Sequence, residues 1–222
     1  MMKRIAVPIT APFMRGAIAD IKEASEIADI NIIELRLDCM NDPDLEKLIG
    51  YSKIPVIVTN RHADEGGGKF KCEEKERIAS LQRACYLKAN YVDIELNHFY
   101  NLDRKSTTRL IVSYHNFNET PENLDEIYKR IVDKGADIVK IATQANSYDD
   151  CERMLDLIKS KHNEKDIIGI CMGKKGIKTR IRGPLEGGYL TFACLDKNKA
   201  SASGQVTIPE LKNYWKILKE FD

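Results

Sequence analysis

The 222-residue sequence has no apolar run long enough to span a membrane, and its N-terminus lacks the apolar segment of a signal peptide. It also lacks an excess of either charge: 35 Lys and Arg stand against 34 Asp and Glu. A nearly neutral chain has no overall attraction to nucleic acid or to anionic membranes. The six cysteines form no C-x-x-C pair, and no histidine follows them at ligand spacing, so neither a disulfide framework nor a zinc site is indicated. We therefore expect a cytoplasmic protein without a metal, nucleic-acid or membrane partner.

Apolar, β-branched segments alternate with amphipathic segments along the whole chain, which is typical of repeated βα units. The pattern predicts eight strands, at 5–10, 31–38, 55–60, 91–96, 108–115, 137–143, 166–173 and 190–195. It predicts helices at 17–28, 44–51, 72–89, 121–134, 147–161 and 209–221. No linker interrupts this series, so we expect one domain over residues 1–222. Eight such units favour an α/β fold of the (β/α)8 TIM-barrel type, although an open doubly wound sheet has the same pattern.

Lys140 lies in the middle of the apolar strand predicted at 137–143. Strand side chains alternate between faces, so Lys140 shares a face with Ile138 and Ala142 and is expected to be buried. Burial without a partner lowers the pKa of a lysine below its reference of about 10.4 and leaves a neutral amine that can attack a ketone. A salt-bridged structural lysine is the open alternative.

Charged side chains occupy one face of the predicted second and fourth strands. Glu34 and Arg36 alternate with leucine and isoleucine, as do Asp93 and Glu95. In a barrel the apolar face meets the helices, so these charges point inward, which is costly unless they pair with one another or bind a ligand. Arg61, after the third strand, adds a positive charge to the same interior.

His115 is expected to point inward at the end of the fifth strand, next to the strand of Lys140. A histidine beside a buried lysine is suited to proton transfer, whereas an isolated one is more often structural. The segment 61–68 ends in three consecutive glycines, which allow a backbone to approach a ligand closely.

Two late segments are candidates for ligand binding. Residues 171–180 are predicted to form a basic loop, in which Arg180 is the best candidate for a bidentate contact with a carboxylate. Residues 198–205 are small and polar and are expected to close over a ligand, although a merely flexible connection has the same composition.

Together these motifs resemble those of type I 3-dehydroquinate dehydratases, in the order of that family and over nearly the whole chain. The segments that resemble the family are 34–38, 61–67, 113–117, 139–142, 172–180 and 201–205. The resemblance implies a barrel that dehydrates the small molecule 3-dehydroquinate without metal or cofactor, and a homodimer. Ser203 is a departure, because the family often has proline there.

The resemblance also implies roles for nine residues. Lys140 matches the lysine that forms the Schiff base, His115 the histidine that transfers protons, and Glu65 the acid beside it. The positions that match substrate contacts are Glu34, Arg36, Arg61, Arg180, Ser201 and Gln205. Two other functions fit the residues: a class I aldolase, which shares the buried lysine, and a carboxylate-binding barrel without catalysis.

Overall fold

The computed structural model describes residues 3–68 and 72–221, which form nine parallel strands and seven α-helices. All eight predicted strands are present, and their bounds are β1 Ile5–Ile9, β2 Ile32–Arg36, β3 Val56–Thr59, β4 Tyr91–Glu95, β5 Arg109–Asn116, β6 Ile138–Gln144, β7 Asp166–Met172 and β8 Thr191–Cys194. A ninth strand, β9 (Val206–Thr207), pairs with β8 and was not predicted.

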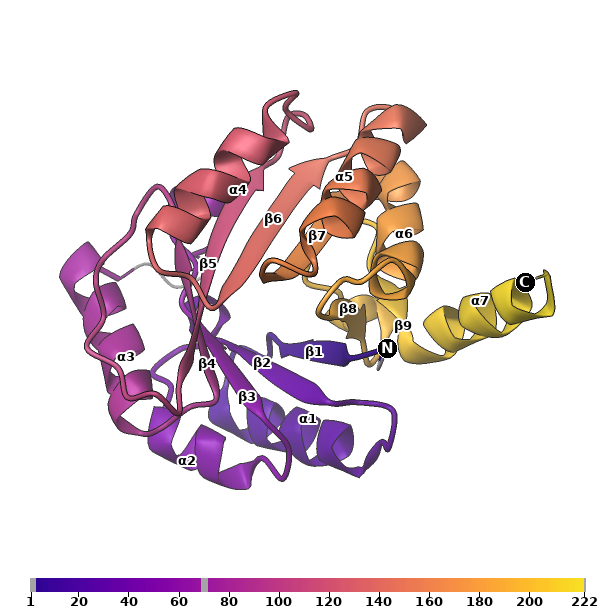
Figure 1. The fold of residues 1–222 in the computed structure, drawn as a ribbon. Coiled ribbons are helices and arrows are strands. Elements are labelled where there is room, and N and C mark those ends of the chain that lie inside the picture. Colours follow the sequence, from indigo (N-terminus) through magenta and orange to yellow (C-terminus); the bar gives the residue numbers. More distant parts are fainter. Residues whose placement is uncertain (1–2, 69–71, 222) are drawn as a thin grey trace.

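The strands form one curled sheet in the order β7-β6-β5-β4-β3-β2-β1-β8-β9. The backbone N–H of Tyr189, just before β8, donates to the carbonyl of Ile167 in β7 at 2.7 Å, so the curl brings β8 back beside β7. The chain is therefore a single-domain α/β barrel, as the alternation of segments predicts, and not an open sheet (Figure 1).

Helices surround the sheet on its outer side (Figure 1). They are α1 Met14–Glu26, α2 Leu45–Tyr51, α3 Glu74–Tyr86, α4 Leu124–Asp133, α5 Tyr148–Lys161, α6 Gly173–Arg182 and α7 Ile208–Phe221. The last helix extends away from the barrel (Figure 1) and is attached in its middle, where the Trp215 indole N–H donates to the Ile181 carbonyl at 2.8 Å.

Two predictions for this layer are wrong. The basic loop predicted at 171–180 is the end of β7 followed by helix α6. The helix expected from residue 121 begins at Leu124, because the Thr120 hydroxyl bonds to Thr143 and to the carbonyl of Gln144 instead of capping a helix. By contrast, Thr207 and Glu210 do exchange hydrogen bonds at the start of α7.

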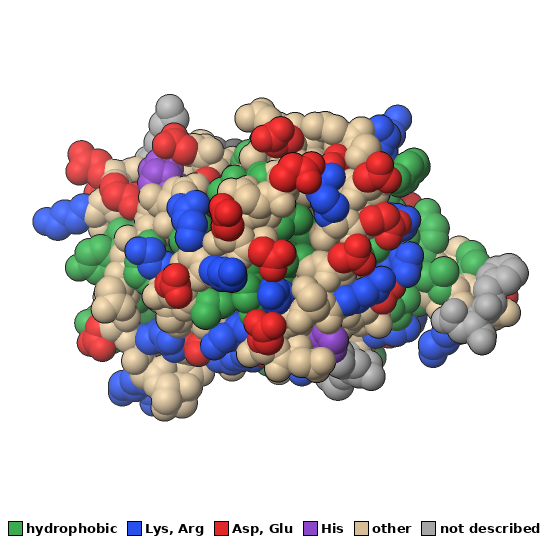
Figure 2. Space-filling view, turned by 45° about the horizontal axis from the view of Figure 1, so that its top comes forward, with side chains coloured by type: hydrophobic (Ala, Val, Ile, Leu, Met, Phe, Trp, Pro, Cys, Tyr) green, Lys and Arg blue, Asp and Glu red, His purple; other side chains and the backbone are tan. Residues whose placement is uncertain are grey.

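The apolar core has two layers, as strand alternation requires. The outer layer lies between sheet and helices and includes Val139 and Ile141, whereas the inner layer fills the barrel and includes Ile111 and Ile138. Lys140 therefore points into the barrel, as predicted. On the surface, basic and acidic side chains are interspersed over the face seen in Figure 2. Within the described residues, no helix has both the length and the apolar character needed to cross a bilayer.

Candidate active site

One cavity of about 590 Å³, including the part open to solvent, lies among the carboxyl ends of the strands and the loops that follow them. In barrels of this kind ligands bind at that end. All nine residues singled out in the sequence line this cavity: Glu34, Arg36, Arg61, Glu65, His115, Lys140, Arg180, Ser201 and Gln205.

Lys140 is buried in the wall of the cavity, with 7% of its side chain exposed. Its Nζ lies 2.7 Å from Asp93 Oδ2 and 3.6 Å from Glu34 Oε1, and 4.9 Å from the centre of the Phe192 ring. The lysine therefore has acidic partners, unlike the unpartnered amine considered from the sequence. The ion pair with Asp93 fixes where the nitrogen sits relative to the cavity.

Asp93 is the centre of a fully buried polar network in the wall. Its carboxylate accepts hydrogen bonds from Lys140 Nζ, from Arg61 Nη2 at 3.0 Å and from the Ser113 hydroxyl at 2.6 Å. Burial opposes its ionisation, but the Arg61 and Lys140 cations hold the pKa of Asp93 below its ordinary value. Asp93 is thus an anion in direct contact with the lysine. The sequence predicted that its side chain points inward but did not identify it as a residue of the site.

Arg61 is held by the same wall. Its Nη1 donates to Glu95 at 3.0 Å and to the Ser113 hydroxyl at 2.7 Å, while Nη2 bonds to Asp93. The guanidinium is 4% exposed, and most of its donors are used within the protein. The structure therefore gives Arg61 a clear part in holding Asp93 and Glu95, whereas its contact with a substrate remains a prediction.

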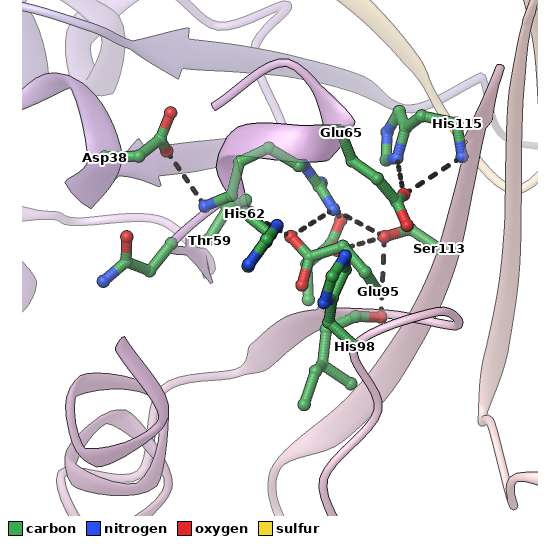
Figure 3. Close-up of polar contacts among 12 residues, drawn as sticks. Asp38, Thr59, His62, Glu65, Glu95, His98, Ser113 and His115 are labelled. Carbon is green, nitrogen blue, oxygen red and sulfur yellow. Dashed lines mark hydrogen bonds and ion pairs between the residues drawn. The ribbon is translucent and has the colours of Figure 1, made fainter. Parts of the chain in front are cut away.

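Glu65, at the end of the short helix Ala63–Glu65, and His115, near the end of β5, form a buried pair. Glu65 Oε2 lies 2.9 Å from His115 Nδ1 and also accepts from the His115 backbone N–H (Figure 3). Glu65 Oε1 accepts from the Asn97 amide. Burial raises the pKa of Glu65 to about 7. Burial, with the Arg61 and Lys140 cations, holds the pKa of His115 well below its usual value. The imidazole is therefore neutral at physiological pH, which is the form that accepts a proton.

The glycines after Glu65 make this arrangement possible. Gly66 has a φ of +79° at the end of the short helix Ala63–Glu65, and a Cβ there would lie 2.5 Å from the Phe117 ring. A Cβ on Gly67 would lie 1.9 Å from the Arg61 carbonyl oxygen. These glycines therefore allow close contacts with other parts of the protein, not with a ligand as the sequence suggested. They allow the tight turn that positions Glu65.

Arg180 lies on α6, not on a loop, and its side chain is buried. Among the described residues no carboxylate lies within ion-pair distance, its Nε has no hydrogen-bond partner, and its Nη2 reaches only the Ser203 carbonyl at 3.5 Å. Burial lowers the pKa of Arg180 to about 10, so the group is still charged at neutral pH. A buried cation without an anion is costly, and an anionic ligand in the cavity would satisfy it.

Glu34 and Arg36 reach the cavity from β2. Glu34 accepts from the Thr59 hydroxyl at 2.9 Å, and Arg36 forms a two-pronged pair with Asp38 at 2.7 and 2.9 Å. Both side chains are therefore fixed by neighbours.

Ser201 and Gln205 come from the loop over the other side of the cavity, where Gln205 Oε1 accepts from the Ser201 N–H at 2.7 Å. The Gln205 amide nitrogen is buried and has no partner among the described residues, which leaves a donor for a ligand.

Apolar side chains complete the wall and were not selected from the sequence. They are Phe117, Ala142, Ile170, Met172 and Phe192. Strand alternation could have placed Ile170 and Phe192 inside the barrel, but the pattern does not distinguish a residue at the cavity from one in the inner core.

The fold and this cavity define a class: a parallel α/β barrel that buries a lysine, a histidine–glutamate pair and an unpaired arginine at the carboxyl ends of its strands. The family model described as type I 3-dehydroquinase matches residues 5–222, and the chain belongs to that family.

Relatives and solved structures agree with this assignment. A 3-dehydroquinate dehydratase of Methanococcus maripaludis strain C5 is 40% identical over 97% of this chain and 100% of the relative. That of Methanocaldococcus jannaschii is 40% identical over 96% and 98%. A type I enzyme from Clostridium difficile, whose structure is described as containing covalently modified comenic acid, aligns with a TM-score of 0.84 and 26% identity, over 99% of this chain and 93% of that one.

Proposed function

We propose that the protein is a hydro-lyase that converts 3-dehydroquinate to 3-dehydroshikimate and water through a Schiff base on Lys140. The observation that supports this most directly is the Lys140 nitrogen in the cavity, paired with Asp93 at 2.7 Å. The family to which the chain belongs and the names of its relatives supply the substrate.

In the first step Lys140, charged in its ion pair with Asp93, gives a proton to His115, and the free amine attacks the ketone carbon. The carbonyl oxygen takes that proton back from His115 and a second one from the attacking nitrogen and leaves as water, so that a protonated imine remains on the lysine. The positive charge thus stays on the same nitrogen, and Asp93, which is already in contact, stabilises it. His115, whose imidazole is neutral, is the base that exchanges protons during this step.

In the second step His115 removes a proton from C2, between the imine carbon and the carbon that bears the hydroxyl. The electron pair moves into the imine to give an enamine. As the enamine collapses back, the C1–O bond breaks, and His115 returns its proton to the departing hydroxyl, which leaves as water. Hydrolysis of the conjugated imine then releases the product and regenerates Lys140. Glu65, bonded to His115 Nδ1, orients the ring so that Nε2 serves as the base.

Arg180 binds the substrate carboxylate, because it is a buried cation with unused donors. Glu34, Arg36, Arg61, Ser201 and Gln205 hold the ring hydroxyls and the imine environment. Fixing the ring against Lys140 and His115 in this way contributes several kcal/mol to the lowering of the barrier, in addition to about 10²- to 10⁴-fold from the general base.

The remaining parts of the proposal rest on the resemblance and on the sequence. Residues 1–222 act as one catalytic domain, the protein works as a homodimer in the cytoplasm, and the reaction needs no cofactor. Its partner is the small substrate, not nucleic acid or a membrane, in keeping with the balanced charge of 35 basic and 34 acidic residues.

The decisive test is a dehydratase assay with 3-dehydroquinate, followed by the absorbance of the conjugated product. We expect turnover in the wild type and a loss of about 10⁴-fold or more in Lys140→Ala. Borohydride reduction in the presence of substrate should label Lys140, as mapped by mass spectrometry. Labelling of another lysine contradicts the assignment. Cleavage of sugar phosphates without dehydration indicates the aldolase, and binding without turnover indicates the non-catalytic barrel.

A further inference from the structure

Three potential metal ligands come together outside the cavity, on the far side of the turn that carries Glu65. His62 and Asp64 follow β3, and His98 follows β4. One ligand atom from each lies within 4.8 Å of the others. Figure 3 shows the rings of His62 and His98 next to each other, beneath the short helix Ala63–Glu65. The proposed reaction uses none of these three side chains.

The separations are close to those of a coordination shell. Asp64 Oδ2 lies 3.7 Å from His62 Nδ1 and 3.8 Å from His98 Nε2. Ligands at about 2.0–2.1 Å from a tetrahedral ion lie about 3.3 Å from one another. Both histidine–carboxylate separations therefore exceed this value by about half an ångström. Two imidazoles and a carboxylate are a donor set that suits zinc and its neighbours in the first transition row.

We propose that His62, Asp64 and His98 form a binding site for a divalent transition-metal ion, and that Zn²⁺ is the preferred ion. Water fills the rest of the coordination shell, because 23% of the His62 side chain, 25% of that of His98 and 75% of that of Asp64 are exposed. This proposal is independent of the proposed function.

Two local rearrangements accompany binding. The rings stack with their centres 3.5 Å apart and their planes at 16°, so one ring must turn before both direct a lone pair at the same ion. The Asp64 N–H donates to His62 Nδ1 at 3.2 Å, and coordination through that nitrogen replaces this exposed bond. Both changes occur at partly exposed side chains and leave the buried network of Asp93 untouched.

Arg77, a cation beside the cluster, is already neutralised by two carboxylates. Arg77, whose Nη2 reaches the His98 carbonyl at 3.4 Å, is paired with Glu95 and Glu74, each at 2.7 Å. Glu74 Oε2 also lies 3.9 Å from His62 Nε2, so a second carboxylate flanks the cluster. The paired charge of Arg77 therefore does not oppose a divalent cation at the cluster.

The site would connect the two segments that hold Glu65. Asp64 precedes Glu65 in the chain, and His98 follows Asn97, whose amide donates to Glu65 Oε1 at 3.1 Å. An ion shared by Asp64 and His98 ties these segments together behind the His115–Glu65 pair. We expect the bound ion to stabilise the fold, since a ligand that binds only the folded state raises Tm.

The test uses the full chain without an affinity tag, stripped of metal by a chelator. Co²⁺ is titrated and its visible absorption recorded, and Zn²⁺ binding is measured by calorimetry and by the change in Tm. We expect one ion per chain and a rise in Tm in the wild type. Asp64→Asn and His98→Gln should each weaken binding by at least about tenfold and remove the rise in Tm. Both keep the size of the side chain, and circular dichroism checks that they fold.

His162→Gln is the matched control, because His162 lies at the end of α5, outside the cluster. It should bind Co²⁺ and Zn²⁺ as the wild type does. The proposal is overturned if the wild type shows no saturable binding, or if Asp64→Asn and His98→Gln bind as tightly as the control variant.

Discussion

Both ends of the barrel carry arginines, but the arginines at the two ends differ in their partners. At the amino end, Arg109 donates to the Tyr189 hydroxyl at 3.0 Å and to Asp166 at 2.6 Å. Arg4 lies over the Tyr189 ring at 4.5 Å, and the Tyr91 and Tyr189 hydroxyls bond at 2.7 Å. Each group at this end has a protein partner, and together they close the barrel.

At the carboxyl end one buried arginine has no acidic partner among the residues that the structure describes. Arg61 is paired with Asp93 and Glu95, but Arg180 has no carboxylate within ion-pair distance in the described part of the chain. A buried cation without an anion reduces the stability of the fold. Since, within the described ranges, such a cation occurs at the carboxyl end and not at the amino end, we infer that Arg180 is kept for a ligand. The comparison thus distinguishes side chains that hold the barrel together from side chains that are available to a ligand.

The largest effect after loss of Lys140 is expected from His115→Ala. Removing the only base proposed for the C2 proton should reduce turnover by about 10²- to 10⁴-fold. Steady-state kinetics measure the loss, and borohydride trapping of the Lys140 adduct shows whether the ketone is still captured. Turnover close to that of the wild type excludes His115 as the main base.

Arg180→Met should reduce kcat/KM by about 10- to 100-fold, the loss expected for charge-assisted hydrogen bonds to a carboxylate. The same change should leave Tm unchanged or raise it, because it removes a buried charge that has no partner. Kinetics and thermal melting of one preparation test both parts. A marked fall in Tm with unchanged kinetics would mean that Arg180 serves the fold.

Glu65→Gln tests the effect of pH at the carboxyl end. The pKa of Glu65 is raised to about 7 in the folded state from 4.5, so folding favours its protonated form. The associated stability is fully present below the unfolded pKa and is lost as pH rises through about 7, by up to about 3 kcal/mol. Denaturant unfolding curves of the variant and the wild type, recorded at intervals of about one pH unit between about pH 4 and 8, measure this loss.

We expect the wild type to lose stability relative to Glu65→Gln across this range, because glutamine does not ionise. Parallel pH profiles for the two proteins would contradict the raised pKa. In activity assays the wild type should gain kcat/KM as pH rises through about 7, since ionised Glu65 accepts the proton on His115 Nδ1 and leaves Nε2 free.

The smallest effect is expected from Arg109→Met, the counterpart of Arg180→Met at the amino end. Its ion pair with Asp166 is more than a third exposed on the acid side, so the free energy of unfolding should fall by only about 1 kcal/mol. kcat/KM should not change. A lower kcat/KM in Arg109→Met would contradict the inference that the arginines of the amino end serve only the fold.

Much of the fold was predictable because apolar, β-branched segments alternate with amphipathic ones along the chain, and because side chains alternate in direction along each strand. All eight predicted strands are confirmed, and so is the inward direction of Lys140. Helix α6 was missed because its sequence is rich in lysine and contains Gly176, which is needed where a Cβ would lie 2.2 Å from the Cys171 carbonyl oxygen. Glycine and clustered charge weaken the helical pattern, although packing against α5 and β7 holds this helix.

The sequence by itself determined which face of the second and fourth strands is charged, and the motifs selected nine residues that line one cavity. Only the tertiary structure decided the pairs: Lys140 with Asp93, Glu65 with His115, and His62 with His98. The physical reason is that side-chain direction follows from local backbone geometry. The distance between side chains on different strands depends on register and on closure of the barrel, which no single segment specifies.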